Sequence, residues 1–183
     1  MKKLIFVSLL MVLATLTACG PKYMVKTDPC PDVRGITAQP GKAALVVGRT
    51  TFLGSGVNFE NYLDRQFIGT TKGHSFFVST VEPGDHYVTA HGENYASMLL
   101  RFEPNKTYYI QNEVRFGAFI ARAKLDFVDA QHLYNDMDGH CDYYVKDPSE
   151  KVDDLNDEEW KWAKEDYSQT EPINAPAKNT VAN

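Results

Sequence analysis

The sequence predicts an all-β fold, an antiparallel β-sandwich with a short C-terminal helix. The main observation is a series of short β-rich runs that starts at Gly41 and is punctuated by turn residues. The last two runs alternate apolar and polar side chains, which places one face of each strand on a core and the other in water. No helical pattern separates the runs, and this disfavours a parallel α/β fold.

The first expected strand, Lys42–Thr50, is apolar on both faces and suits the centre of a sandwich. The clearest boundary is the turn Glu82-Pro83-Gly84-Asp85, because Pro presets φ and Gly accepts positive φ. Asp64-Arg65 and Pro104-Asn105-Lys106 are interpreted as further turns. Between these boundaries the expected strands are Asn58–Leu63, Gln66–Thr70, His74–Val81, Asp85–Gly92 and Ala96–Phe102.

The two final strands, Thr107–Phe116 and Ala121–Val128, carry the strongest alternation. On the apolar face of Thr107–Phe116, Asn112 is the one polar residue. After Asp129 the alternation stops.

The N-terminus has the features of a secretion signal. Lys2 and Lys3 precede an apolar run, Leu4–Leu13, that is far shorter than the ~20 residues needed to span a bilayer. The following Leu16-Thr17-Ala18-Cys19 resembles the lipobox of bacterial lipoproteins. The resemblance implies that residues 1–18 are a lipoprotein signal peptide and that Cys19 carries lipid, including palmitate. The alternative is an ordinary secretory signal with a chance cysteine.

Two or three acyl chains at Cys19 would anchor the protein almost permanently, because each buried CH₂ contributes ~0.8 kcal/mol. In such lipoproteins an Asp after the cysteine favours the inner membrane, so Gly20 resembles the outer-membrane class. These features predict an outer-membrane protein that is lipid-anchored and faces the periplasm.

Two cysteines remain after lipidation, Cys30 and Cys141. The periplasm is oxidising, so this pair predicts one disulfide bond that closes a long loop and stabilises the fold by roughly 2–5 kcal/mol. The alternative is two buried or reactive thiols.

The expected organisation has three parts beyond the signal and the sandwich, which is placed at residues 42–146. Residues 19–41 contain four prolines and are interpreted as a lipidated tether that lifts the domain off the membrane. Residues 147–167 form an acidic segment with a helix over Leu155–Tyr167, where Asn156 and Glu159 match a capping box. Residues 168–183 are polar and are expected to be disordered.

The region Gly41–Val128, about half of the chain, resembles an uncharacterised family of bacterial lipoproteins that carry a domain of unknown function. The resemblance is carried by the segments Gly41-Lys42-Ala43-Ala44-Leu45, Phe67-Ile68-Gly69, Glu82-Pro83-Gly84-Asp85-His86 and Asn105-Lys106-Thr107-Tyr108-Tyr109. It implies a small transthyretin-like or immunoglobulin-like sandwich and an envelope location. It implies no catalytic residue.

Asp136, Asp138 and Asp142 are the weak candidates for a metal site, since Asp136, Asp138 and Gly139 have the spacing of a calcium loop. The pattern fails at its first and twelfth positions, which hold Tyr134 and Val145. The favoured interpretation is a polar turn that presents Cys141 to Cys30. The chain also lacks zinc-binding spacings and the Gly-x-Ser-x-Gly motif of a catalytic serine.

These features indicate a class of function and a kind of partner. A net charge of −5 argues against a nucleic-acid partner, and no cofactor is expected. The sequence favours a non-catalytic envelope module that binds an envelope protein or the cell wall, with Trp160 and Trp162 either packed on the sandwich or exposed as an interaction site. The alternative is a small-ligand or calcium-binding lipoprotein that uses the Asp136–Asp142 loop.

Overall fold

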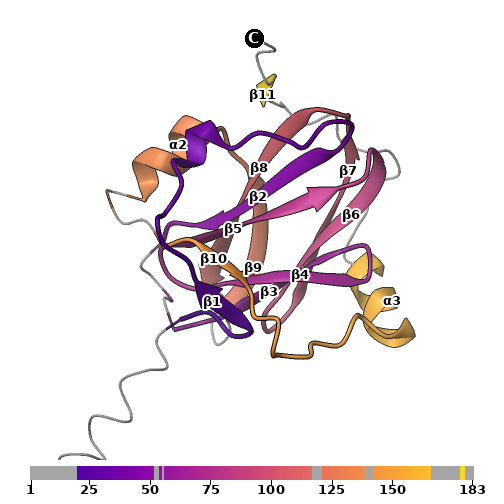
Figure 1. Cartoon of the computed structure of the whole chain (residues 1–183). Helices are drawn as coiled ribbons and strands as arrows, with labels where there is room; N and C mark the ends of the chain where they lie inside the picture. The colour runs from indigo at the N-terminus through magenta and orange to yellow at the C-terminus, as the bar shows by residue number, and fades with distance from the viewer. Residues whose placement is uncertain are drawn as a thin grey trace, which may run out of the picture.

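The computed structural model describes residues 20–51, 54, 56–116, 121–137, 139, 142–165 and 178–179 (Figure 1). Two β-sheets face each other, which confirms the all-β class, and a short helix lies near the C-terminal end of the described chain. The signal peptide, Cys19, Cys141 and almost all of the polar tail lie outside the described residues. Among the described helices, none has the length and apolarity needed to cross a bilayer.

The first sheet is mixed. Its central strands β2 and β8 run parallel, with Ala44 opposite Thr107, whereas every other pair in the two sheets is antiparallel. The strands lie in the order β5, β2, β8, and both β9 and β11 pair with β8. Their bounds are β2 Ala43–Arg49, β5 Ser75–Val81, β8 Lys106–Phe116, β9 Ala121–Phe127 and β11 Lys178–Asn179.

The second sheet is a four-stranded antiparallel sheet in the order β4, β3, β6, β7. The strands are β3 Phe59–Leu63, β4 Gln66–Thr71, β6 Gly84–His91 and β7 Tyr95–Phe102. Two of the predicted turns have the positive φ that tight turns require. Asp64, between β3 and β4, has a φ of 53°, and Asn105, between β7 and β8, has a φ of 60°. The predicted strands therefore lie within one or two residues of the observed ones.

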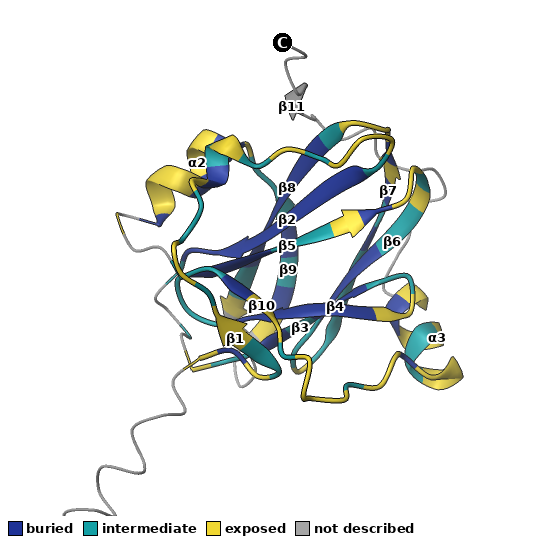
Figure 2. Ribbon diagram, in the orientation of Figure 1, coloured by how far each residue is buried: buried dark blue, intermediate teal, exposed yellow. Residues whose placement is uncertain are grey.

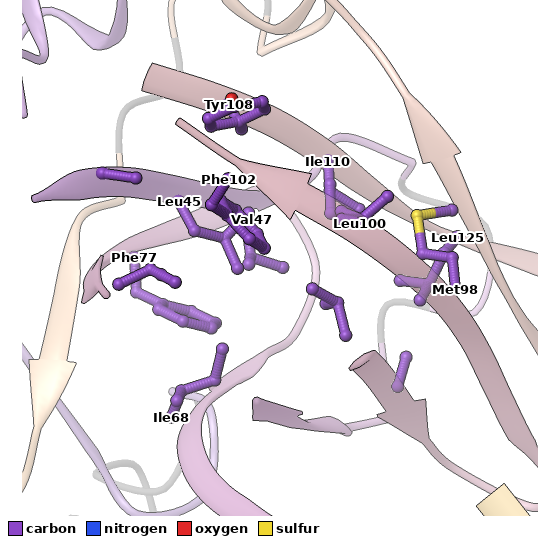
Figure 3. Packing of buried hydrophobic residues seen from close by; sticks show 14 of the residues in the cluster. Leu45, Val47, Ile68, Phe77, Met98, Leu100, Phe102, Tyr108, Ile110 and Leu125 are labelled. Carbon is purple, nitrogen blue, oxygen red and sulfur yellow. The ribbon is translucent and has the colours of Figure 1, made fainter. Parts of the chain in front are cut away.

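The core fills the space between the two sheets (Figure 3). All seven residues of β2 are buried, which confirms its expected central place (Figure 2). Asn112, the polar exception of β8, is also fully buried and projects between the sheets. Its side-chain amide donates to Asn61 Oδ1 (2.9 Å) and to Thr71 Oγ1 (2.8 Å) of the opposite sheet.

Helix α2 (Ala130–Asp136) covers the outer face of the first sheet, in a region where the sequence pattern predicts no element. The Asp129 carboxylate caps it by accepting from the His132 backbone N–H (2.7 Å). Leu133 is fully buried against Gly48, and a Cβ on Gly48 would lie 2.5 Å from Leu133 Cδ1. A glycine in the central strand is what lets this helix approach the sheet.

Helix α3 (Asp157–Glu165) begins two residues later than expected, with the predicted capping box in place. The Asn156 side-chain oxygen accepts from the Glu158 and Glu159 backbone N–H groups (both 3.0 Å). Glu159 in turn accepts from the Asn156 backbone N–H (2.9 Å). Ala163 is fully buried beneath the helix, whereas Tyr167 lies outside the described residues.

Residues 20–41 differ from the expected tether because they lie on the domain. Strand β1 (Met24–Lys26) pairs with β10 (Tyr144–Lys146) in a separate two-stranded ribbon, and the 3-10 turn Val33–Gly35 buries Val33. Tyr23 also packs edge-on against Phe67, with ring centroids 5.9 Å apart. This proline-containing segment therefore runs along the surface of the domain and is not a free tether.

Candidate functional site

An open groove of about 590 Å³ lies where the edges of the two sheets meet, between β7 and β9. Tyr95 and Met98 of β7 line one side, and Trp162 of α3 closes one end. Arg115, Arg122 and Lys124 of the β8–β9 pair line the other side. The groove therefore combines aromatic surface with positive charge, although the whole chain carries a net charge of −5.

Arg115 and Arg122 lie directly opposite each other on β8 and β9, and both are exposed. Two like charges at directly opposed positions of a sheet are unfavourable. In the described part of the chain, neither guanidinium has a carboxylate partner. An anionic group bound in the groove would relieve this repulsion, and Arg can hold a carboxylate or phosphate through two parallel hydrogen bonds.

Lys124 has its own acidic neighbours. Its ammonium group pairs with Asp126 and lies 3.7 Å from Glu113. Partial burial and the adjacent Asp126 raise the pKa of Glu113. The positive charge of Lys124 is thus largely balanced within the strand pair. Arg115 also interacts electrostatically with Glu113, but neither arginine forms an ion pair with a carboxylate of the described residues.

The aromatic side of the groove consists of Trp162 and Tyr95. Trp162 is 47% exposed, and its ring centroid lies 6.4 Å from that of Tyr95. Tyr95 stacks on His91 in turn, with centroids 4.2 Å apart and planes only 8° from parallel. Burial raises the pKa of Tyr95 to about 12, so its hydroxyl stays protonated at neutral pH. The rings form a rigid surface for a ligand.

Trp160 has a different environment from Trp162. Its ring packs edge-on against Tyr87 of β6, with centroids 5.4 Å apart, and the Arg65 and Lys164 side chains lie over it. The sequence analysis left packing and interaction open for both tryptophans. The structure separates them: Trp160 packs on the sandwich, and Trp162 borders the groove.

Asn94 fixes one end of the groove. Its side chain forms a pair of hydrogen bonds with the backbone of Ala123: the Ala123 N–H donates to Asn94 Oδ1 (2.7 Å), and Asn94 Nδ2 donates to the Ala123 carbonyl (3.5 Å). This pair imitates the bonding of a neighbouring strand. It ties the β6–β7 turn to the edge of β9 and so holds the two sheets at a set separation.

His86 and His91 each lie beside a single acidic side chain. His86 Nδ1 lies 2.8 Å from Asp64 Oδ2, and His91 Nδ1 lies 3.8 Å from Glu60 Oε2. The interaction with His91 is the main cause that lowers the pKa of Glu60. Among the described residues, no three His, Cys, Asp or Glu side chains gather into a group that could hold a metal ion.

The structure gives the calcium-loop alternative no added support. Asp136 ends α2 and lies 3.1 Å from His132 Nε2, while Asp142 forms an ion pair with Lys26. Each carboxylate thus faces a basic side chain, and Asp138 lies outside the described residues. The carboxylates described here lack the shared centre that oxygen coordination of Ca²⁺ requires.

Cys30 is disulfide-bonded, and both cysteines that could pair with it lie outside the described residues. Cys30 lines a small pocket together with Met137 and Gly139, close in sequence to Cys141. The Thr27 backbone N–H also donates to the Tyr143 carbonyl (2.9 Å), which extends the β1–β10 pairing toward both cysteines. These neighbours favour Cys141 as the partner, and the pairing stays a prediction.

The groove could not be predicted from the sequence, because its charged side depends on the register between β8 and β9. Arg115 and Arg122 both lie on the polar faces of the expected last strands, but their opposition requires the pairing of β8 with β9. The alternation in both strands and the short connection between them were the signals that could have indicated it. No sequence pattern marks Asn94, because its hydrogen bonds to Ala123 form only where the edges of the two sheets meet.

No protein-family model matches this chain. An uncharacterised protein of Haemophilus influenzae is 25% identical over 126 residues, which cover 68% of this chain and 75% of the Haemophilus protein. At this identity the similarity assigns neither a family nor an activity.

Proposed function

We propose that this protein is a lipid-anchored envelope lipoprotein of the outer membrane, facing the periplasm, whose β-sandwich is a non-catalytic module that binds an anionic partner in the groove between β7 and β9. The observation that carries the proposal is the pair of opposed arginines beside the exposed Trp162. Arg and Trp are the side chains that dominate binding energy at protein interfaces. The partner is an envelope protein or the cell wall, and it contributes the carboxylate or phosphate that the arginines lack.

The anchor part of the proposal is supported by the order of features that ends at Cys19. Intact-protein mass spectrometry of the mature chain checks it directly. The wild type should begin at Cys19 and carry the added mass of the acyl chains, and Cys19→Ala should carry none. A wild-type chain that starts elsewhere without lipid would contradict the anchor.

The binding part is tested by recovery of the partner from detergent-solubilised envelopes with the lipidated protein as bait. Arg122→Glu reverses one of the opposed charges, and Trp162→Ala removes the exposed ring. Matched controls are Lys161→Glu, a charge reversal at an exposed site of α3, and Tyr134→Ala, which removes a ring of similar exposure from α2.

The wild type and both controls should recover the same stoichiometric partner, and the two groove variants should lose it. Trp162→Ala should melt near the wild type, and Arg122→Glu should melt no lower, because it replaces an opposed pair of like charges by a pair of opposite charges. Equal recovery by all five proteins would place the binding surface elsewhere. A partner that survives Arg122→Glu and dissociates from Tyr134→Ala would assign the site to α2 instead.

A further inference from the structure

The described chain is held against the domain from its first residue. Gly20 packs on the ring of Tyr144, so closely that a Cβ would lie 3.3 Å from Tyr144 Cε1. Pro21 is buried, and the Lys22 backbone N–H donates to Asn58 Oδ1 (3.1 Å). The Asp147 backbone N–H then donates to the Tyr23 carbonyl (2.9 Å), and the next residues form β1, which pairs with β10.

Because Gly20 already contacts the domain, no free linker residue separates the proposed anchor at Cys19 from the fold. One residue spans at most about 3.5 Å. Cys19 directly precedes Gly20 in the sequence, so acyl chains on it would enter the bilayer close to the surface around Tyr144. The tether expected from the prolines would have allowed the domain to move away from the membrane, whereas this geometry holds one part of its surface at the head groups.

The surface next to Gly20 is the β1–β10 ribbon, which lies at one side of the sandwich (Figure 1). Val25 and Val145 face each other across the ribbon and are 42% and 38% exposed. They are two of the four large apolar side chains that are exposed in the described residues. Met24 and Tyr144 of the same strands face inward, so Val25 and Val145 lie on the outward face of the ribbon.

Charge around the ribbon is compatible with anionic head groups. Lys22, Lys26 and Lys146 are exposed beside the ribbon. Lys26 and Lys146 are paired with Tyr144 and Met24, so they lie on the face opposite the two valines, and the long Lys146 side chain would reach the head groups from the rim of the ribbon. Lys26 is paired with Asp142, and Lys22 lies 3.8 Å from Glu60, so these two contribute little net charge. Among these three lysines, Lys146 has most to gain from anionic lipid, because no ion pair with a carboxylate of the described residues involves it.

We propose that the β1–β10 ribbon is the membrane-facing surface of the anchored protein, with Val25 and Val145 against the lipid interface and Lys146 among the head groups. The inference rests on the proposed anchor at Cys19. It adds to that anchor a fixed orientation, in which the acyl chains and the ribbon enter the same membrane.

The test uses the full lipidated protein in vesicles of phosphatidylethanolamine and phosphatidylglycerol, labelled with a water-soluble reagent that acylates lysines. The reference is unlipidated Cys19→Ala in solution, and mass spectrometry reads both the lipid and each lysine. Lys146 should lose most of its reactivity in the vesicles. Lys161 on α3, which is 73% exposed, should react equally in both samples.

A second variant separates contact from mere proximity. Lipidated Val25→Asp with Val145→Asp should regain labelling at Lys146, because two carboxylates on the ribbon are repelled from anionic lipid. The matched control is Tyr134→Asp, and far-UV circular dichroism confirms the fold of each. The apolar contact is wrong if the double variant leaves Lys146 protected.

The two proposals fail in different ways. If the wild type carries no lipid, the proposed anchor fails and this orientation fails with it. If the lipid is present and Lys146 reacts as fast in vesicles as in solution, the anchor stands and the membrane-facing ribbon is wrong.

Discussion

Asn112 is a single residue that links the two sheets through polar contacts in an otherwise apolar core. Its amide nitrogen donates to Asn61 and Thr71, and Asn61 in turn donates to the Phe59 carbonyl (2.9 Å). All three side chains are buried. Buried polar groups are costly when one member is removed, because the others lose their partners.

Replacing Asn112 with Leu should therefore destabilise the protein by about 1–3 kcal/mol, despite the added apolar surface. Asn61 Oδ1 and Thr71 Oγ1 would be left without this donor in the core. Urea denaturation of the variant and the wild type measures the difference. A variant as stable as the wild type would show that the polar link contributes specificity alone.

Gly48 is the second position where one side chain decides the packing of an element. Gly48→Ala should cost about 1–3 kcal/mol, because the new Cβ would meet Leu133 at 2.5 Å and α2 would have to move outward. Gly35→Ala is a suitable control, since nothing lies within 4 Å of a Cβ at that glycine. Gly48→Ala should melt at a lower temperature than Gly35→Ala. Equal melting temperatures would mean that α2 can move outward with little loss of stability.

At the scale of the element, α3 attaches to the sandwich through one of its two tryptophans. Trp160→Ala should lower stability by about 2–4 kcal/mol, because its ring packs on Tyr87 and beneath Arg65. Trp162→Ala should leave the melting temperature near that of the wild type, since about half of that side chain is already in water. Thermal melts of Trp160→Ala and Trp162→Ala test this prediction. A lower melting temperature for Trp162→Ala than for Trp160→Ala would contradict the assignment of Trp160 to packing.

The elements that the sequence predicted are those with local signals. The strands from β2 to β9 follow from alternation and turn residues, and α3 follows from its capping box. The elements that the sequence did not predict are β1, β10, β11, α2 and the 3-10 turn Val33–Gly35. Of these, β11 lies in the segment that was expected to be disordered. Strands β1 and β10 have three residues each and exist only through their pairing, while α2 depends on the clearance above Gly48. The groove was missed for the same reason, because Arg115 and Arg122 meet only through strand register.

At the scale of the whole molecule, buried tyrosines make stability depend on alkaline pH. Burial raises the pKa of Tyr109 and of Tyr95 to about 12, and it also raises the pKa of Tyr62. Between the ordinary value of 10.0 and about 12, the folded protein holds protons that the unfolded chain loses. Stability should therefore fall as the pH rises through this range.

Arg49 acts in the opposite direction. It is fully buried, donates to the Val57 and Gly54 carbonyls (both 2.5 Å), and burial lowers its pKa to about 10. Above that pH the unfolded chain binds the extra proton, so this group adds stability as the pH rises. Burial also raises the pKa of Tyr108, so four tyrosines oppose one arginine. The net expectation is a urea midpoint that is lower near the upper end of this pH range than near its lower end. Tyr109→Phe should flatten the decline, and a rising midpoint would mean that Arg49 dominates.

The parallel pair of β2 and β8 has a consequence for the order of events in folding. Ala44 lies opposite Thr107, so the centre of the main sheet cannot close until the chain has been synthesised at least as far as β8. Such non-local pairing delays folding to milliseconds or seconds, because the loop entropy is lost before the contacts form. A chain whose central strands are this far apart in the sequence cannot complete its main sheet from the N-terminal half alone. The strand order that stabilises the finished sandwich thus also delays its formation.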